Sequence, residues 1–419
     1  MTAVSATVHP SRASATARRG GLPIMLYEAG TEKLAGVGHP LREQARAHLP
    51  APPSTRAWDF LSIALAVFAT DRFVLRSRAA DGWTRQIAIE IDLADPAPWE
   101  PLKPRLAAAL RFLTGDIWHV NFRGDGSRPP TWHPKLTDRD CICLFSGGLD
   151  SFIGAADLID AGRSPILVSQ ASPKEGPTQE YLARQLGLEQ NRFEGKAIER
   201  RAPPYEASSR SRSILFLAYG VVAATALHSD GRRVQLVLPE NGLISINPPF
   251  YLRRLGSLST RTTHPHFISE LQGILSDAGL SVELVNPYRG KTKGEMLAAC
   301  KNHTVSRIAY STYSCGKGKR LNQHCGRCVP CLIRRAAFVR ANLQDRTEYW
   351  ANDLSTHGAN DDVFAARFAT AQLPNRDIGR WAAQSGPLPY ISAERAVYVD
   401  VVRRGLEELG AFLHGVPWQ

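Results

Sequence analysis

The spacing of apolar and polar residues divides the chain into segments with different patterns. From about Asp138 onward, short apolar runs alternate with stretches whose apolar residues recur at helical spacing. The runs predict strands over 142–145, 165–169 and 234–238, and the helical spacing predicts helices over 151–161, 177–187 and 211–228. Regular alternation of this kind is typical of a parallel sheet with helices on both faces. The sequence therefore predicts an α/β fold for this part of the chain.

Residues 25–135 show a different mixture of patterns. Strands are expected over 73–75, 87–91 and 118–122, and a helix is expected over about 102–113. The Gly- and Pro-rich stretch 124–134 is the best candidate for a linker. We therefore expect an N-terminal α+β domain over 25–135, followed by the α/β domain over 136–345.

The two ends of the chain differ from these domains. Residues 1–24 contain no acidic residue and carry three arginines among Ser, Ala and Thr, without the apolar core of a secretion signal. This composition predicts a disordered basic tail. Residues 346–419 have helical spacing, most clearly over 393–413, and predict a C-terminal helical extension.

A glycine-rich turn follows the first strand of the α/β part. The string Ser146-Gly147-Gly148-Leu149-Asp150-Ser151 joins a buried strand ending at Phe145 to a helix start. Glycines let backbone amides approach a ligand, and the helix dipole favours an anion there. Ligands of parallel sheets bind beyond the carboxyl ends of strands, so we expect the other strand ends to face the same crevice, with Ser169, Gln170, Asn241 and Gly242. The alternative is an ordinary strand-to-helix turn.

Four of the seven cysteines lie close together in the sequence. Cys315, Cys325, Cys328 and Cys331 form a Cys-x2-Cys-x2-Cys group with a fourth cysteine ten residues upstream. Four thiolates can complete a tetrahedral shell around Zn²⁺, leaving no open position, which is typical of a structural site. An iron–sulfur cluster and unliganded cysteines are the alternatives. Clustered cysteines of this kind favour a reducing, cytoplasmic location over a disulfide framework.

Composition narrows the class of protein. The chain has 419 residues, a net charge of +12 and 43% hydrophobic residues, which is enough for packed cores. The basic residues are spread along the chain, so a nucleic-acid partner fits the charge but is not favoured. No apolar run approaches the roughly 20 residues that a membrane-spanning helix needs, so we expect a soluble protein with no membrane partner.

The glycine-rich turn resembles the PP-loop of N-type ATP pyrophosphatases, which bind the pyrophosphate of ATP and adenylate a substrate. Together with the downstream cysteines it resembles the QueC family of 7-cyano-7-deazaguanine synthases over about residues 138–340. Two further segments are similar to that family, namely 212–216 and 286–295. The resemblance implies a PP-loop core, of the adenine nucleotide alpha hydrolase type, with a four-cysteine zinc knuckle.

The resemblance also implies a reaction and its groups. Family enzymes use ATP to adenylate the carboxylate of 7-carboxy-7-deazaguanine, and ammonia then attacks on the way to a nitrile. ATP, Mg²⁺ and Zn²⁺ are the implied cofactors. Residues Phe145, Ser146, Gly147, Gly148, Leu149, Asp150 and Ser151 would hold ATP, together with the strand-end residues named above. Asp150, Ser151, Arg212, Lys291 and Lys293 are the candidate catalytic residues, with Arg212 compensating phosphate charge and either lysine stabilising the adenylation transition state. A solvated basic face is the alternative for the last three.

Departures from the family bear on the acceptor. The segment Ser259–Pro265 differs from the Ser-Gly-Tyr-Pro-Asp-Cys-Arg-like segment with which the synthases recognise the base. The extra N-terminal domain and helical extension make the chain look more like the QueC-like proteins of Qat-type anti-phage defence operons. The expected function is therefore adenylation of a 7-deazapurine acid followed by attack of ammonia or of an amine on a partner protein from the same operon. A housekeeping 7-cyano-7-deazaguanine synthase, a PP-loop tRNA-modifying enzyme and a non-catalytic nucleotide-binding subunit are the alternatives.

Overall fold

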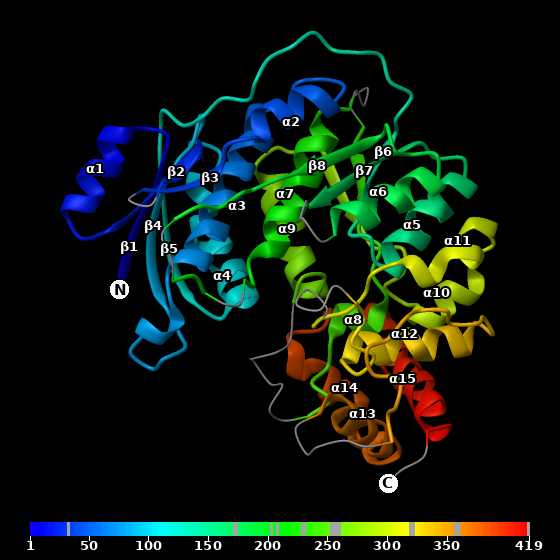
Figure 1. Ribbon diagram of the computed structural model, residues 1–419. Helices are drawn as coiled ribbons and strands as arrows, with labels where there is room; N and C mark the ends of the chain where they lie inside the picture. The colour runs from blue at the N-terminus through cyan, green and yellow to red at the C-terminus, as the bar shows by residue number, and fades with distance from the viewer. Residues whose placement is uncertain are drawn as a thin grey trace.

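Two parallel sheets form the framework of the protein (Figure 1). The computed structural model describes residues 1–31, 34–170, 175–201, 204–206, 209–227, 232–251, 261–317, 323–355 and 361–416. The first sheet has the order β3-β2-β1-β4-β5, with strands β1 (Thr2–Thr7), β2 (Leu22–Glu28), β3 (Ala35–Gly38), β4 (Gln86–Asp92) and β5 (Ile117–Arg123). The second has the order β10-β9-β6-β7-β8, with strands β6 (Cys141–Leu144), β7 (Pro165–Gln170), β8 (Arg192–Gly195), β9 (Val234–Val237) and β10 (Val282–Val285).

All strand pairs in the two sheets are parallel, and helices lie between and around the sheets, which confirms the α/β fold class. In each sheet the strand order reverses beside the first strand, between β1 and β4 and between β6 and β9. The helices that follow β6 and β7 begin as predicted within two residues. The helices of the described residues are α1 (Pro10–Arg18), α2 (Leu41–His48), α3 (Thr55–Phe73), α4 (Lys103–Thr114), α5 (Leu149–Asp160), α6 (Gly176–Gln185), α7 (Arg212–Thr225), α8 (Gly242–Ile246), α9 (Pro265–Asp277), α10 (Lys293–Ala299), α11 (His303–Ile308), α12 (Val329–Arg340), α13 (Asp362–Ala371), α14 (Ile378–Ala382) and α15 (Ser392–His414).

The N-terminal residues differ most from the sequence-based expectation. Residues 1–24 are not a disordered tail, because they form β1, α1 and the start of β2. Strand β1 lies in the middle of the first sheet, and its Val4 and Ala6 are buried there. Small residues such as Ser, Ala and Thr are typical of low-complexity tails, but here they fill a central strand. The first unit is also α/β rather than α+β, since its strand pairs are parallel.

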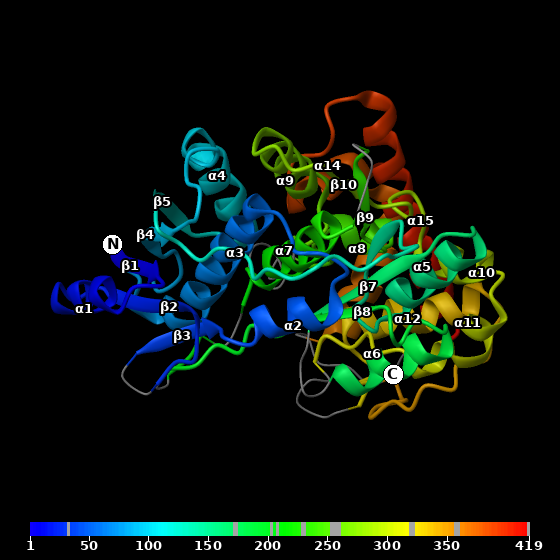
Figure 2. The ribbon, with the colours of Figure 1, turned by 90° about the horizontal axis from the view of Figure 1, so that it is seen from above.

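Helix α3 joins the two units. It is buried on nearly every side, and it packs against α7 of the second unit, so that both helices lie between the two sheets in Figures 1 and 2. Side chains of both units contribute to a single hydrophobic core. The predicted strand over 73–75 is wrong because α3 continues to Phe73. The predicted linker does lack regular structure, and the chain from 124 to 140 runs along the outside of the molecule (Figure 1).

The C-terminal residues form the expected helical extension. Helix α15 packs against α8, α12, α13 and α14, below the second sheet in the view of Figure 1. Their apolar side chains form a separate core, which includes the buried residues Trp381 and Leu406. Among the helices in the described part of the chain, none combines the length and apolar character needed to cross a membrane.

At the carboxyl end of the first sheet, an ion cluster fills the point where the strand order reverses. Asp92 at the end of β4 is fully buried, and it accepts a hydrogen bond from the Thr7 hydroxyl. Arg12 of α1 and Arg123 of β5 each place a guanidinium nitrogen 3.0 Å from Asp92 Oδ1. The side chains of this unit therefore occupy its own crevice.

Burial of Asp59 on α3 predicts a pH effect on stability. Its carboxylate accepts hydrogen bonds from the backbone amides of Ala94 and Asp95, at 2.7 and 3.0 Å, but burial still raises its pKa to about 7. An unfolded aspartate has a pKa of about 3.9, so the stabilising effect of the protonated group is complete below about pH 4 and is lost as the pH rises through about 7. We expect Asp59→Asn to flatten this dependence, as measured by urea unfolding across that interval. Equal pH slopes for the variant and the wild type would contradict the assignment.

Candidate functional site

The glycine-rich turn lies at the carboxyl end of β6, the central strand of the second sheet. Gly147 has a φ of +82°, which favours glycine, and a Cβ atom there would lie 3.0 Å from the Cγ atom of Gln179. Gln179 Nε2 donates to Ser146 O at 3.1 Å, and Tyr313 N donates to Gly147 O at 2.8 Å. The turn is thus held from two sides while the Ser146 side chain stays exposed.

The amides of the turn make only long contacts in the described structure. Gly148 N lies 3.3 Å from Ser146 Oγ, and Leu149 N lies 3.4 Å from Ser314 Oγ. Both distances are at the weak end for hydrogen bonds, and such bonds exchange readily for stronger ones to a charged oxygen. Ser151 Oγ donates to Gly148 O at 2.9 Å, which fixes the first turn of α5. The arrangement offers amides and a helix N-terminus to an anion.

Asp150 is tied to two other strand ends. Its carboxylate accepts hydrogen bonds from Asn241 N at 3.1 Å and from Asn241 Nδ2 at 2.6 Å, and it pairs with the ammonium of Lys293. Asn241 follows β9 and caps α8, whereas Lys293 is the first residue of α10 and lies within the capping box that Thr292 and Glu295 form. The structure thus brings Asp150, Asn241 and Lys293 into one cluster.

Charges around Asp150 set which groups are ionised. Burial alone would raise the pKa of Asp150, but the Lys293 ammonium and hydrogen bonds to the carboxylate hold this pKa below its usual value. Burial, together with the negative charge of Asp150, raises the pKa of neighbouring Glu240 well above its usual range. One carboxylate thus balances one ammonium, and Glu240 favours its neutral form. Glu240 directly precedes Asn241 in the sequence, and the sequence analysis gave it no role.

The remaining strand-end candidates lie in different settings. Arg212 Nε donates to Gln170 Oε1 at 2.9 Å, and its Nη2 donates to Glu175 Oε2 at 2.6 Å. Ser169 is buried and donates to Phe145 O at 2.7 Å, so it supports the turn from below. The amide of Gly242 donates to Lys291 O at 2.9 Å, so this N–H already has a hydrogen-bond acceptor within the chain.

Lys291 stands apart from Lys293. Its side chain is exposed, and its ammonium lies 5.9 Å from the centre of the Tyr288 ring. Lys293, by contrast, is 6% exposed and contacts Asp150. Of the two predicted lysines, the structure places only Lys293 in the cluster of Asp150 and Asn241.

The four clustered cysteines come together as a compact sulfur site. Their Sγ atoms all lie within 4.8 Å of one another and are buried. The Cys315–Cys328 and Cys325–Cys331 sulfur distances are 3.8 and 3.9 Å. A tetrahedral site with Zn–S bonds of about 2.3 Å has sulfurs about 3.8 Å apart, so the four cysteines fit zinc. The amides of Cys325 and Cys328 each lie 3.3 Å from a cysteine sulfur and stabilise thiolate charge.

The cysteine site is connected to the glycine-rich turn. Tyr313 and Ser314, which contact Gly147 and Leu149, immediately precede Cys315. Arg334 of α12 is fully buried and donates to Thr312 Oγ1 at 2.7 Å, which anchors the same segment. Sequence reasoning missed these contacts and that of Gln179. Proximity of Ser314 to Cys315 in the sequence was the available signal.

Part of the divergent base-recognition segment can be placed. Ser259 and Thr260 lie outside the described residues, but Arg261 donates to Phe112 O at 2.8 Å. His264 caps α9 through its ring, and burial lowers its pKa to about 3, so it is neutral. These residues contact helix α4 of the first unit. The family resemblance did not predict this contact.

The comparison with protein families identifies the region that contains this segment and the cysteines. Residues 262–342 match the family model described as Queuosine biosynthesis protein QueC. Over these residues the chain is similar to the QueC family. The match includes Lys293 and the four cysteines, whereas the glycine-rich turn lies before it.

Curated relatives agree with this assignment. A 7-cyano-7-deazaguanine synthase of Rhizobium etli is 35% identical over 105 residues, which cover 23% of this chain and 43% of that protein. The protein of the same name from Saccharolobus solfataricus is 25% identical over 234 residues, covering 50% and 47%. The protein of that name from Methanothermobacter thermautotrophicus is 44% identical over 68 residues, covering 16% and 29%. The QueC-like chain thus spans less than half of the length of these relatives, and no solved structure matches it significantly.

Loss of one zinc ligand should unfold the region around the turn. We expect the purified QueC-like protein to contain about one zinc ion per chain and Cys328→Ser to lose it, with a fall in Tm of about 5 °C or more, because three thiolates leave the site incomplete. Metal content by atomic emission and thermal unfolding measure both effects. Cys300→Ser, at a cysteine outside the cluster, is the matched control and should keep the zinc. Iron with visible absorbance in the wild type would instead indicate a cluster.

Proposed function

We propose that this QueC-like chain is an ATP-dependent, AMP-forming enzyme that adenylates the carboxylate of a 7-deazapurine acid and transfers the acyl group to an amine. The observation that carries the proposal is the joint position of the glycine-rich turn and the Asp150–Lys293 pair. Both lie at the carboxyl ends of strands, where the order of the second sheet reverses between β6 and β9. That is the position at which open parallel sheets bind nucleotides.

The first half of the reaction uses the turn. The substrate carboxylate oxygen attacks the α-phosphorus of ATP, and the bond to the β-phosphate breaks to release pyrophosphate. The turn amides and the N-terminus of α5 would hold the departing anion, as their weak contacts leave them available to phosphate oxygens. Mg²⁺ bound to the phosphates would spread the developing charge.

Lys293 is suited to the transition state of adenylation. Its ammonium is buried, so the charge is screened less than it would be in water. Asp150 fixes the position of this ammonium, and preorganised charge of this kind stabilises negative charge that develops during reaction. Arg212 is assigned to the phosphates with the same logic, although Glu175 already neutralises part of its charge.

The second half of the reaction is attack of an amine on the acyl adenylate, with AMP as the leaving group. The names of the relatives support a 7-deazaguanine acid as the acyl donor. We assign the acceptor to ammonia or to an amine of a partner protein, in anti-phage defence, because the first unit and the helical extension add surface around the crevice. A housekeeping 7-cyano-7-deazaguanine synthase is the second candidate, and the relatives' printed name favours it.

Product analysis with a lysine variant tests the proposal. With ATP and 7-carboxy-7-deazaguanine, we expect pyrophosphate and AMP, and Lys293→Met should lower kcat by about 100-fold or more because the transition-state charge loses its partner. Lys301→Ala, at an exposed lysine just after α10, is the control and should retain activity. Release of ADP and phosphate would contradict adenylation.

Two further measurements separate the alternatives. Mass spectrometry distinguishes a free nitrile, the product of the housekeeping enzyme, from an adduct on a co-expressed protein. Salt-sensitive retention of tRNA in a gel shift would favour the RNA-modifying alternative. Full biological function of Lys293→Met would favour a non-catalytic subunit.

A further inference from the structure

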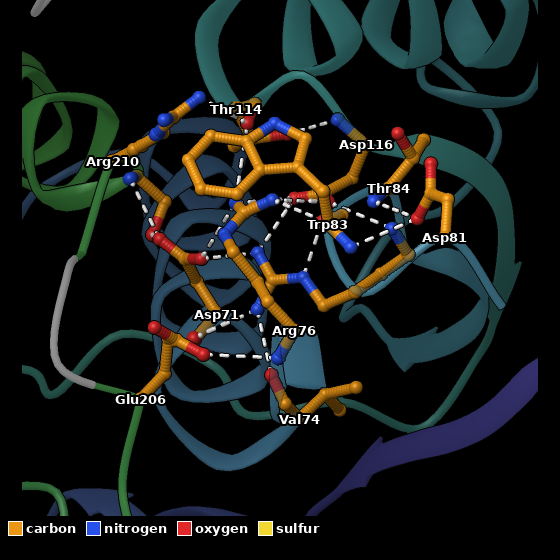
Figure 3. Close-up of polar contacts among 12 residues, drawn as sticks. Asp71, Val74, Arg76, Asp81, Trp83, Thr84, Thr114, Asp116, Glu206 and Arg210 are labelled. Carbon is orange, nitrogen blue, oxygen red and sulfur yellow. Dashed lines mark hydrogen bonds and ion pairs between the residues drawn. The ribbon is translucent and has the colours of Figure 1, made fainter. Parts of the chain in front are cut away.

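A buried cluster of four charged residues lies at the edge of the first unit that faces the second (Figure 3). Asp71, Arg76, Arg85 and Asp116 are all less than 5% exposed. Arg76 binds both oxygens of Asp116, at 2.8 and 2.9 Å, and Arg85 contacts both aspartates. Two carboxylates balance two guanidinium groups, so the cluster is neutral within its own unit.

One oxygen of this cluster reaches into the second unit. Asp71 Oδ1 contacts Arg85, whereas Asp71 Oδ2 accepts hydrogen bonds from Ser211 N at 2.9 Å and from Ser211 Oγ at 2.8 Å. Ser211 is the N-cap residue of α7, and its side chain makes no capping bond within that helix. A carboxylate at this position also favours the helix dipole. Helix α7 is therefore capped by a residue of the other unit.

The chain leading to α7 is fastened to the first unit at two more points. The Glu206 carboxylate accepts from Arg76 N at 2.9 Å, and Glu206 N donates to Arg72 O at 2.8 Å. The Arg210 guanidinium lies over the ring of Trp83, 4.8 Å from its centre, and donates to Thr114 O at 3.3 Å. Figure 3 shows Glu206 and Arg210 on opposite sides of the cluster. These contacts thus fix the start of α7 relative to the first unit.

The residue after Ser211 is Arg212, whose guanidinium contacts Gln170 and Glu175 at the carboxyl edge of the second sheet. Consecutive Cα atoms are about 3.8 Å apart, so any shift of Ser211 is passed directly to Arg212. We propose that Asp71 is a positioning residue for the ATP site, because it holds the start of α7 and thereby places Arg212. This inference rests on the proposed function, and it makes the first unit part of the nucleotide site.

A purely structural cluster would behave differently from a positioning one. Removing one member of a buried ion pair costs stability wherever the pair lies, since it leaves the other charge uncompensated. Only a positioning role predicts that loss of Asp71 raises the KM for ATP while leaving the KM for the acid substrate unchanged. The two roles therefore separate in the kinetic parameters.

The Asp71→Asn variant of the full chain tests this role. We expect its KM for ATP to rise about tenfold while the KM for 7-carboxy-7-deazaguanine stays unchanged, because the neutral amide caps α7 less well. Ser211→Ala, which removes the same contact from the other side, should act in the same direction, and the double variant should be no worse than Asp71→Asn alone. Additive effects of the two substitutions would overturn the proposal.

Asp59→Asn is the matched control. Asp59 is a buried aspartate on the same helix, but its carboxylate contacts are the backbone amides of Ala94 and Asp95 within the first unit. This variant should change stability without changing the KM for ATP. An equal rise in KM for both variants would show a general effect of destabilisation and would overturn the proposal.

Hydrogen exchange keeps this test independent of the proposed function. Without ATP, the amides of residues 213–216 should exchange faster in Asp71→Asn than in the wild type. In Asp59→Asn the exchange rates of the same amides should equal those of the wild type. Unchanged exchange in Asp71→Asn would refute the capping role. Faster exchange in a protein that releases no pyrophosphate would instead leave the cap established and remove the adenylation proposal.

Discussion

Helix α3 is buried on almost every side, and water is excluded from it only because both of its sides are covered. The first sheet covers one side and α7 covers the other, so the two sheets are joined through a single core. Burial of this extent is the main source of stability in globular proteins. The relative position of the two units is therefore set by the packing of α3 against α7 within this shared core. Residues of the first unit can consequently hold residues of the second in fixed positions, because the two units share one core.

The elements that depend on local chemistry were predictable from the sequence. The turn after β6 was predicted because paired glycines directly after a short apolar run are typical of a ligand-binding turn. The four-cysteine site was predicted because four cysteines at ligand spacing are typical of a metal site. Helices α5 and α15 begin within two residues of their predicted starts. The rule that ligands bind at strand ends pointed to Asp150 and Asn241, whereas Lys293, which contacts Asp150, was a candidate only through the family resemblance.

The errors have a common cause, which is that burial depends on partners distant in the sequence. Ser, Ala and Thr in β1 resemble a flexible tail until β2 and β4 are placed on either side. Phe73 is typical of a strand, but α7 and the first sheet allow α3 to continue to it. The contacts of Gln179 and Ser314 with the turn were equally invisible, because an amide or a hydroxyl on an ordinary helix or loop carries no local signal. The pKa of Glu240 is raised by burial and by the charge of Asp150, and the fold supplies both.

The two sheets have matching strand orders, but they differ in what lies at the point where the order reverses. Each sheet presents a reversal point of the kind at which nucleotides bind, yet the first one is filled by Asp92 with its two arginines. Those guanidinium groups supply internally the charge compensation that a bound anion would otherwise receive. At the second reversal point the Ser146 side chain is exposed, and the amides of Gly148 and Leu149 make only long contacts. The two sheets thus share one backbone plan, but in the first sheet residues from two elements, Arg12 of α1 and Arg123 of β5, close the reversal point from within.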